Sequence, residues 1–194
     1  MPEDRFDPSG YLTFDLARGS ASLPDAASAV VLPADVLERV AGGKDGIGPA
    51  LVARPLGEWL GARLRERLAA GGGNPADASP ESFLAQANGL LAVHGLGRIS
   101  LEAYGDAVLL RTELVVLPKA GAGFLEPFCS GLFGAFLGRE VPCLALDGPG
   151  GACVLIGSPP AVRRAAQLKA AGVPAETIAT RLHQESRAAR EGKR

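Results

Sequence analysis

The sequence predicts an α+β fold in which helices pack on one antiparallel sheet of about four to five strands. Apolar residues recur with helical spacing in the first half of the chain and at its C-terminal end, and they alternate with period two in two central segments. A glycine-containing turn interrupts each alternating segment, as in a hairpin. With 194 residues, of which 47% are hydrophobic and 21% charged, the chain can bury one domain-sized core.

Residues 1–29 are expected to form an N-terminal arm with a short strand. In this arm Tyr11, Thr13 and Asp15 alternate with apolar neighbours, so we expect these odd positions to face water. The next run predicts a short extended entry and one helix that ends at Gly42-Gly43.

Residues 46–70 form the longest helical pattern. Leucines recur there at strict i+4 spacing, at Leu56, Leu60, Leu64 and Leu68. Pro55 lies inside this pattern and predicts a kink or a break, because proline lacks the amide hydrogen that the helix needs. Ser79-Pro80 then supplies an N-cap and a first-turn proline for the following helix.

A glycine stripe marks the helix expected over about 124–137. Gly131, Gly134 and Gly138 lie at i, i+3 and i+7, on one side of a helix. Each glycine costs about 1 kcal/mol relative to alanine, so close packing should offset the loss. We expect the glycine stripe to pack against the sheet, a second subunit or a flat ligand. With Trp59 and Phe128, these glycines are the candidate residues for a ligand pocket or for close packing.

Residues 98–117 predict one hairpin, and VPCLALD and ACVLIG predict a second, joined by the turn GPGG. Two terminal helices are expected within 159–194. They superficially resemble a helix-turn-helix, but the second helix sets Glu176 and Glu185 against its few arginines. A helical hairpin without nucleic acid is therefore the favoured interpretation.

Charge and cysteine content exclude several classes of protein. Twenty Lys and Arg against 21 Asp and Glu give a net charge of -1, which favours no polyanionic partner. The chain has no apolar run long enough for a membrane span, and its three cysteines show no zinc-ribbon spacing, so a cytoplasmic location is expected.

His94 and His183 have no neighbouring ligand residues, and His94 is expected at a helix end where the dipole favours its charge. No nucleophile elbow or P-loop is present, and we assign no catalytic residue.

Three segments carry a resemblance to a known family: VVLPADVLERV, LLAVHGLGRISLEAYGDAVLLRTEL and SGLFGAFLGREVPCLALDGPGGACVLIG. In this order they resemble the 4-vinyl reductase domain family, a relative of transport-protein-particle subunits and haem nitric-oxide-binding domains. The resemblance covers roughly residues 30 to 170 and places the domain itself at 30–158, with a transport-particle-subunit-like fold. It implies a small-molecule-sensing or protein-assembly domain that is often dimeric.

The resemblance also implies a metal site in those members that are similar to sensors of aromatic compounds. Three of the four positions that correspond to the metal ligands fall here near Ala122, Ala145 and Gly148. Only the fourth ligand, Cys153, is retained. No metal or other cofactor is therefore expected. The alternative is a shifted zinc site, whose four ligands would be Cys129, Cys143, Asp147 and Cys153.

The function expected from the sequence is a non-enzymatic, dimeric domain that binds a hydrophobic small molecule in an apolar pocket, as a sensor or carrier. This interpretation predicts a cavity of about 300 Å³ or more between the helices and the sheet. The alternative is a scaffold or adaptor that binds protein partners, which predicts a filled core and an exposed apolar patch. A tetrapyrrole vinyl-reductase-related enzyme is the third interpretation.

Overall fold

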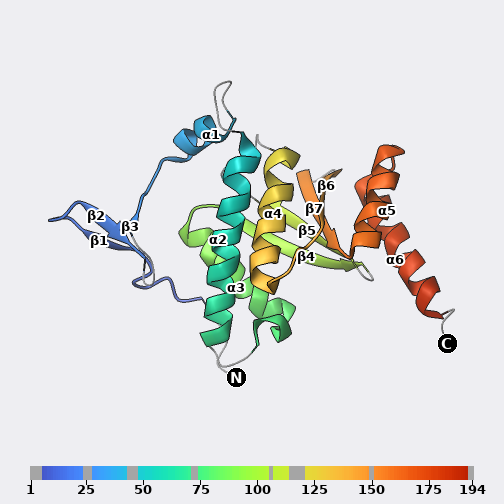
Figure 1. Cartoon of the computed structure of the whole chain (residues 1–194), viewed down its shortest axis with the longest axis horizontal. Coiled ribbons are helices and arrows are strands. Elements are labelled where there is room, and N and C mark those ends of the chain that lie inside the picture. Colours follow the sequence, from blue (N-terminus) through green and yellow to red (C-terminus); the bar gives the residue numbers. More distant parts are fainter. Residues whose placement is uncertain are drawn as a thin grey trace.

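The chain forms an α+β fold, as predicted, with helices on an antiparallel sheet (Figure 1). A computed structural model describes residues 6–23, 28–42, 48–70, 74–104, 107–113, 121–148 and 151–191. The turns expected at 105–106 and 149–150, and the helix end expected at Gly43, lie outside these residues.

The N-terminal arm is a small antiparallel sheet of three strands, β1 (Thr13–Asp15), β2 (Ser20–Ser22) and β3 (Ser28–Ala29). It stands away from the rest of the molecule (Figure 1) and is followed by α1 (Ala34–Gly42). The expected orientation of its side chains is wrong at Tyr11, which is buried, and at the apolar positions Phe14 and Leu16, which are 57% and 90% exposed. Tyr11 precedes the strand and packs on the helices, so it does not follow the strand alternation.

The main sheet has four strands in the order β4-β5-β7-β6, and all neighbours are antiparallel. Its strands are β4 (Arg98–Tyr104), β5 (Ala107–Glu113), β6 (Cys143–Gly148) and β7 (Gly151–Gly157). Both predicted hairpins are thus confirmed, and β5 and β7 join them at the centre.

Helices cover both faces of this sheet (Figure 1). On one face lie α2 (Pro49–Ala70), α3 (Pro80–Val93) and α4 (Gly121–Leu137), with a short 3-10 helix (Pro75–Asp77) before α3. On the other face lie α5 (Pro159–Ala170) and α6 (Ala175–Glu191). Strand alternation divides the apolar side chains between two cores, because Leu110 and Val154 face the first group while Leu109 and Leu155 face the second.

Local signals explain where these helices begin and continue. The Ser79 hydroxyl accepts the amide hydrogen of Ser82 at 3.1 Å, so Ser79 is the N-cap of α3, as predicted. Helix α2 runs through Pro55 without a break. Pro55 and Leu51 are both exposed, so water can satisfy the Leu51 carbonyl that proline leaves without a donor.

The outer edge of β6 is closed by two charged side chains from opposite layers. The Ala145 amide donates to Glu126 Oε2 of α4 at 2.9 Å, and Lys169 Nζ of α5 donates to the Ala145 carbonyl at 2.7 Å. These bonds occupy backbone groups that an added strand would otherwise use.

Helices α2 and α4 run parallel and side by side (Figure 1), and their backbones touch. A Cβ on Gly57 would overlap the carbonyl oxygen of Phe128 and lie 2.9 Å from the Leu132 nitrogen. A Cβ on Gly61 would overlap the carbonyl oxygen of Leu132. Glycine is therefore required at two successive turns of α2.

The opposite side of this contact is Gly131 of α4. A Cβ there would lie 2.5 Å from the Arg54 carbonyl oxygen and 2.9 Å from the Glu58 nitrogen. Gly134 differs, because its Cβ would meet only the Arg139 carbonyl oxygen, at an ordinary 3.6 Å.

Gly138 ends α4. Its φ is 66°, and the amide of Arg139 donates to the Gly134 carbonyl at 3.2 Å, which is the six-to-one bond of a Schellman motif. The glycine stripe of the sequence thus serves three purposes: a helix contact at Gly131, an ordinary position at Gly134 and a helix end at Gly138.

The two neighbouring glycines of α4 provide a matched test of this packing. Gly131→Ala should lower the free energy of unfolding by about 1–3 kcal/mol, because the added methyl group meets backbone that cannot move aside. Gly134→Ala should leave it unchanged or raise it by up to about 1 kcal/mol, because alanine is the better helix former. Urea denaturation of both variants measures the difference. Equal effects of the two substitutions would contradict the assigned helix contact.

Candidate functional site

Aromatic side chains gather where the N-terminal arm meets α2 and α3. The Tyr11 ring lies 5.7 Å from the Phe6 ring and 5.6 Å from the His94 ring, centroid to centroid. The Trp59 ring contacts His94 edge to face at 5.1 Å. Trp59, a predicted site residue, therefore belongs to the cluster that holds the arm.

His94 lies at the C-cap of α3, the helix end that the sequence predicted. Its Nε2 is 3.4 Å from the Tyr11 hydroxyl, and burial lowers the pKa of the imidazole below its ordinary value of 6.5. The sequence interpretation that a charged ring is favoured here is therefore wrong, because burial favours the neutral form. The neutral imidazole acts as an aromatic contact for the arm.

Phe6 holds the arm at a second point. A Cβ on Gly89 of α3 would overlap the Phe6 ring, so the ring lies directly against bare backbone. The guanidinium carbon of Arg67 lies 4.4 Å from the Phe6 ring centroid. The arm is thus attached to α3 and α2 by two aromatic side chains.

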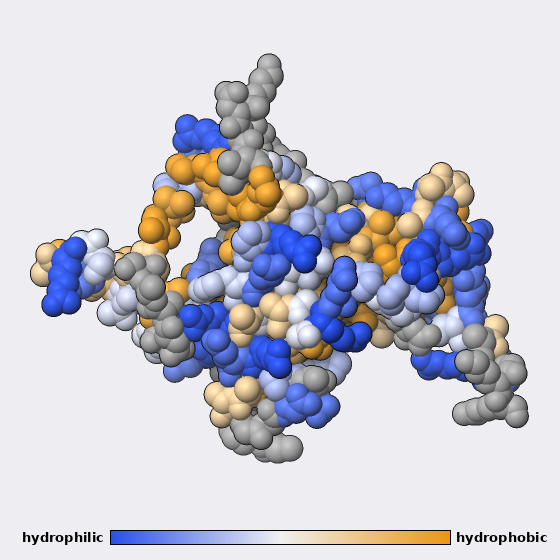
Figure 2. Space-filling model, in the orientation of Figure 1, coloured by the Kyte–Doolittle hydropathy of each residue, from blue (hydrophilic) through white to orange (hydrophobic). Residues whose placement is uncertain are grey.

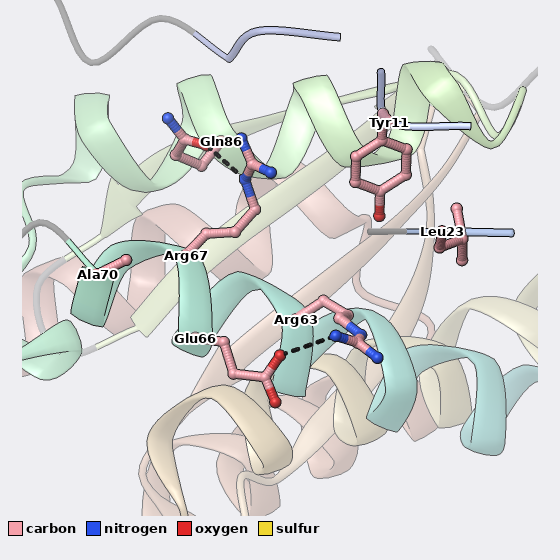
Figure 3. Close-up of a pocket in the computed structure, with 7 residues that line it drawn as sticks. All are labelled: Tyr11, Leu23, Arg63, Glu66, Arg67, Ala70 and Gln86. Carbon is pink, nitrogen blue, oxygen red and sulfur yellow. Dashed lines mark hydrogen bonds and ion pairs between the residues drawn. The ribbon is translucent and has the colours of Figure 1, made fainter. Parts of the chain in front are cut away.

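A cavity of about 360 Å³ lies beside this attachment, between the arm and the two helices (Figure 3). The residues that line it are Tyr11, Leu23, Arg63, Glu66, Arg67, Ala70 and Gln86. We call it the arm cavity. It differs from the pocket expected from the sequence, which was apolar and placed between the helices and the sheet.

The arm cavity has one polar wall. Arg67 reaches from α2 to α3, where its Nε donates to Gln86 Oε1 at 3.2 Å (Figure 3). Gln86 is only 8% exposed. Arg63 Nη1 donates to Glu66 Oε2 at 3.2 Å, and its guanidinium carbon lies 5.8 Å from the Trp59 ring centroid. The wall therefore presents fixed hydrogen-bonding groups, which can orient a ligand.

The other predicted site residues lie along the contact of α4 with its neighbours. Phe128 is 2% exposed and stacks on Phe124 with centroids 5.6 Å apart. Gly131, Gly134 and Gly138 follow it on α4 at the positions described above. None of the five predicted residues lines the arm cavity.

Sequence reasoning missed the cavity residues Tyr11, Arg63, Arg67 and Gln86. Arg63 has the spacing of the solvent-facing side of α2, and Tyr11 was placed toward water. One signal was available, because Gln86 interrupts the apolar stripe of α3 next to Phe83 and Ala87. A buried amide in such a stripe needs a polar partner, and Arg67 supplies it.

The structure does not bring the four residues of the shifted zinc set together. Cys129 and Cys143 belong to the core on the α4 side of the sheet, whereas Cys153 faces α5 and α6. Burial raises the pKa of Cys143 to about 12 and also raises the pKa of Cys129, so both favour the neutral thiol. Over the described part of the chain, no three His, Cys, Asp or Glu side chains converge as a metal site.

Comparisons with known proteins agree with the fold. The sequence matches no protein-family profile, and a comparison with curated proteins found no match. Among solved structures, the phenol-responsive sensory domain of the transcription activator PoxR, crystallised with phenol, superposes with a TM-score of 0.52 at 16% sequence identity. The match covers 76% of this chain and 84% of that domain. In the described ranges, no helix has the length and apolar character needed to span a membrane.

The buried imidazole predicts a specific pH dependence. Because the folded protein lowers the pKa of His94, the unfolded chain binds more protons at this site once the pH falls below 6.5. Stability should therefore be lost as the pH falls from 6.5 toward the lower pKa of the folded state. Between pH 7.5 and 5, the melting temperature of the wild type should fall more steeply than that of His94→Gln.

His183 provides the control, because it is exposed on α6. The melting temperature of His183→Gln should follow that of the wild type over the same range. Parallel curves for the wild type and His94→Gln would mean that His94 does not contribute to the pH dependence.

Proposed function

We propose that this chain is a small-molecule-binding domain of the 4-vinyl reductase type that acts as a sensor or carrier, without catalysis of its own. The arm cavity is the observation that carries the proposal. Its volume of about 360 Å³ suits a small organic molecule, and its walls combine apolar, aromatic and fixed polar groups. The sequence favours a hydrophobic ligand; the mixed walls favour an amphipathic one.

The position of the arm cavity supports a way to report binding. Tyr11 and Leu23 belong to the N-terminal arm, whereas the remaining lining residues belong to α2 and α3. A ligand that contacts both sides binds the attached arm better than the detached arm, and it therefore shifts the population toward attachment. The arm is thus the element whose position would report the bound ligand.

The similarity to a phenol-responsive sensory domain supports the same class of function. It extends over most of both chains, and the matched domain belongs to a transcription activator. The proposed membership of the 4-vinyl reductase family depends on the order of the glycine-containing helix and the last hairpin. This order is compatible with the similarity in fold to the PoxR sensory domain.

The proposal is tested by native mass spectrometry of the protein purified from its own host. We expect a bound small molecule in the wild type. Ala70→Trp should abolish it, because the indole fills the arm cavity. Ala69→Trp, at an exposed neighbour on α2 that does not line the cavity, should retain it. A ligand that survives Ala70→Trp, or a wild type without any ligand, would contradict the proposal.

A second proposed property is self-association through an exposed apolar patch. Figure 2 shows apolar surface over the extended segment before α1 and over the adjoining end of α2. The large exposed side chains of this segment, of α1 and of the first turn of α2 are Val30, Val31, Leu32, Val40 and Leu51. Val30, Val31 and Leu32 are consecutive apolar residues that are 79%, 64% and 56% exposed, which favours an interface. A homodimer is the occupant that we propose, and a partner protein bound in its place is the scaffold alternative.

Val31→Asp tests this interface. Its side chain is 64% exposed, so the charge should leave the fold intact. It should convert the dimer to a monomer, because a two-fold interface would bury the introduced aspartate of each copy in an apolar contact. Light scattering after size exclusion measures the mass. A monomeric wild type, or a dimeric variant, would contradict this interface.

A further inference from the structure

We infer that the arm cavity takes a monocarboxylate with a small apolar body and that Arg67 binds its carboxylate. This inference rests on the proposed function and names the class of ligand for the same cavity.

Arg67 differs from the other half-buried arginines. Arg63 pairs with Glu66 at 3.2 Å, and Arg111 pairs with Glu102 at 2.7 Å. Among the described residues, no carboxylate lies within ion-pair distance of Arg67. A partly buried guanidinium that forms no direct ion pair has lost hydration at its terminal nitrogens, and a bound anion would replace the lost hydrogen bonds.

The Arg67 side chain is already held in place for such an anion. Its Nε is bonded to buried Gln86, and its guanidinium carbon lies 4.4 Å from the Phe6 centroid and 6.0 Å from the Tyr11 centroid. The two terminal nitrogens of the planar fork are then the donors that can meet a carboxylate. Because these contacts fix the fork before binding, little side-chain entropy is lost when the ligand binds.

The charges around the cavity favour a single negative charge. Among the described residues that line it, Arg63, Arg67 and Glu66 are charged, and together they carry one net positive charge. Asp7 is near enough that Arg67 contributes to the lowering of its pKa, although the main cause is hydrogen bonding to Ser9. The Asp7 Oδ1 accepts the Ser9 amide at 2.8 Å and makes no ion pair with Arg67. A dianion such as phosphate is disfavoured, because Glu66 shares the same wall.

The remaining walls select the body of the ligand. Leu23 and Ala70 are apolar, and the Tyr11 ring lies along the same cavity (Figure 3). A volume of about 360 Å³ is at the lower end of ordinary ligand pockets, so the body must be small. Benzoate satisfies these conditions and is a suitable probe.

Isothermal titration calorimetry of the full chain at constant ionic strength tests the inference. The probes are benzoate, its neutral analogue benzyl alcohol, and inorganic phosphate. Wild type should bind benzoate at least about tenfold more tightly than benzyl alcohol, because the charge-assisted bonds to Arg67 are lost in the alcohol. Arg67→Met should weaken benzoate by about tenfold or more and leave benzyl alcohol nearly unchanged.

Two further variants control for charge and folding. Arg163→Met removes the same charge from an exposed position on α5 and should not alter benzoate binding. Arg67→Lys keeps the charge but loses the planar fork, so it should bind benzoate with intermediate affinity. If Arg67→Met fails to fold, Arg67→Lys still tests the role of Arg67, because its affinity for benzoate should be lower than that of the wild type.

The outcomes separate the two proposals. Equal affinity for benzoate and benzyl alcohol, or benzoate binding that does not depend on residue 67, overturns the carboxylate inference while the cavity remains a binding site. Phosphate that binds as tightly as benzoate overturns the monocarboxylate class, as does the absence of benzoate binding. Benzoate binding that persists in Ala70→Trp overturns the assignment of the arm cavity itself.

Discussion

The direct contact between the backbones of α2 and α4 is the constraint on which the rest of the structure depends. Helix pairs normally stand about 8–10 Å apart, because side chains separate them. Here Gly57, Gly61 and Gly131 remove those side chains, so α2 lies against α4 at short range. Since α4 packs on β6 and β7, this contact fixes the position of α2 relative to the whole sheet. Arg63 and Arg67 are carried on the far part of α2, and their positions follow from the same contact.

Close packing in the middle of the molecule explains why the cavity lies at its margin. Phe83 of α3 contacts Phe133 and Phe136 of α4 at centroid distances of 5.5 and 5.0 Å, so aromatic rings fill the contact between these two helices. The arm, by contrast, is attached to α2 and α3 through a few aromatic contacts. Segments attached in this way open at low cost in free energy, which is the property that a ligand-responsive element needs.

The secondary structure could be predicted from the sequence because it depends on local patterns, whereas the cavity depends on tertiary contacts. Period-two alternation located both hairpins, and Ser79-Pro80 located the start of α3. The sequence pattern does not single out the glycines of α2, because the leucine spacing dominates the same helix. Tyr11 was placed toward water because its contact with His94 spans 83 positions of sequence, which no local pattern records. Gln86 alone carried a local signal, as a buried polar residue on an apolar face.

Hydrogen exchange in Gly57→Ala tests the central claim most directly. If α2 and α4 form one unit through their backbones, the added methyl group should reduce amide protection in both helices together and also in residues 6–12 of the arm. Loss of protection confined to the first turns of α2 would contradict this account, because the two helices would then be stabilised independently.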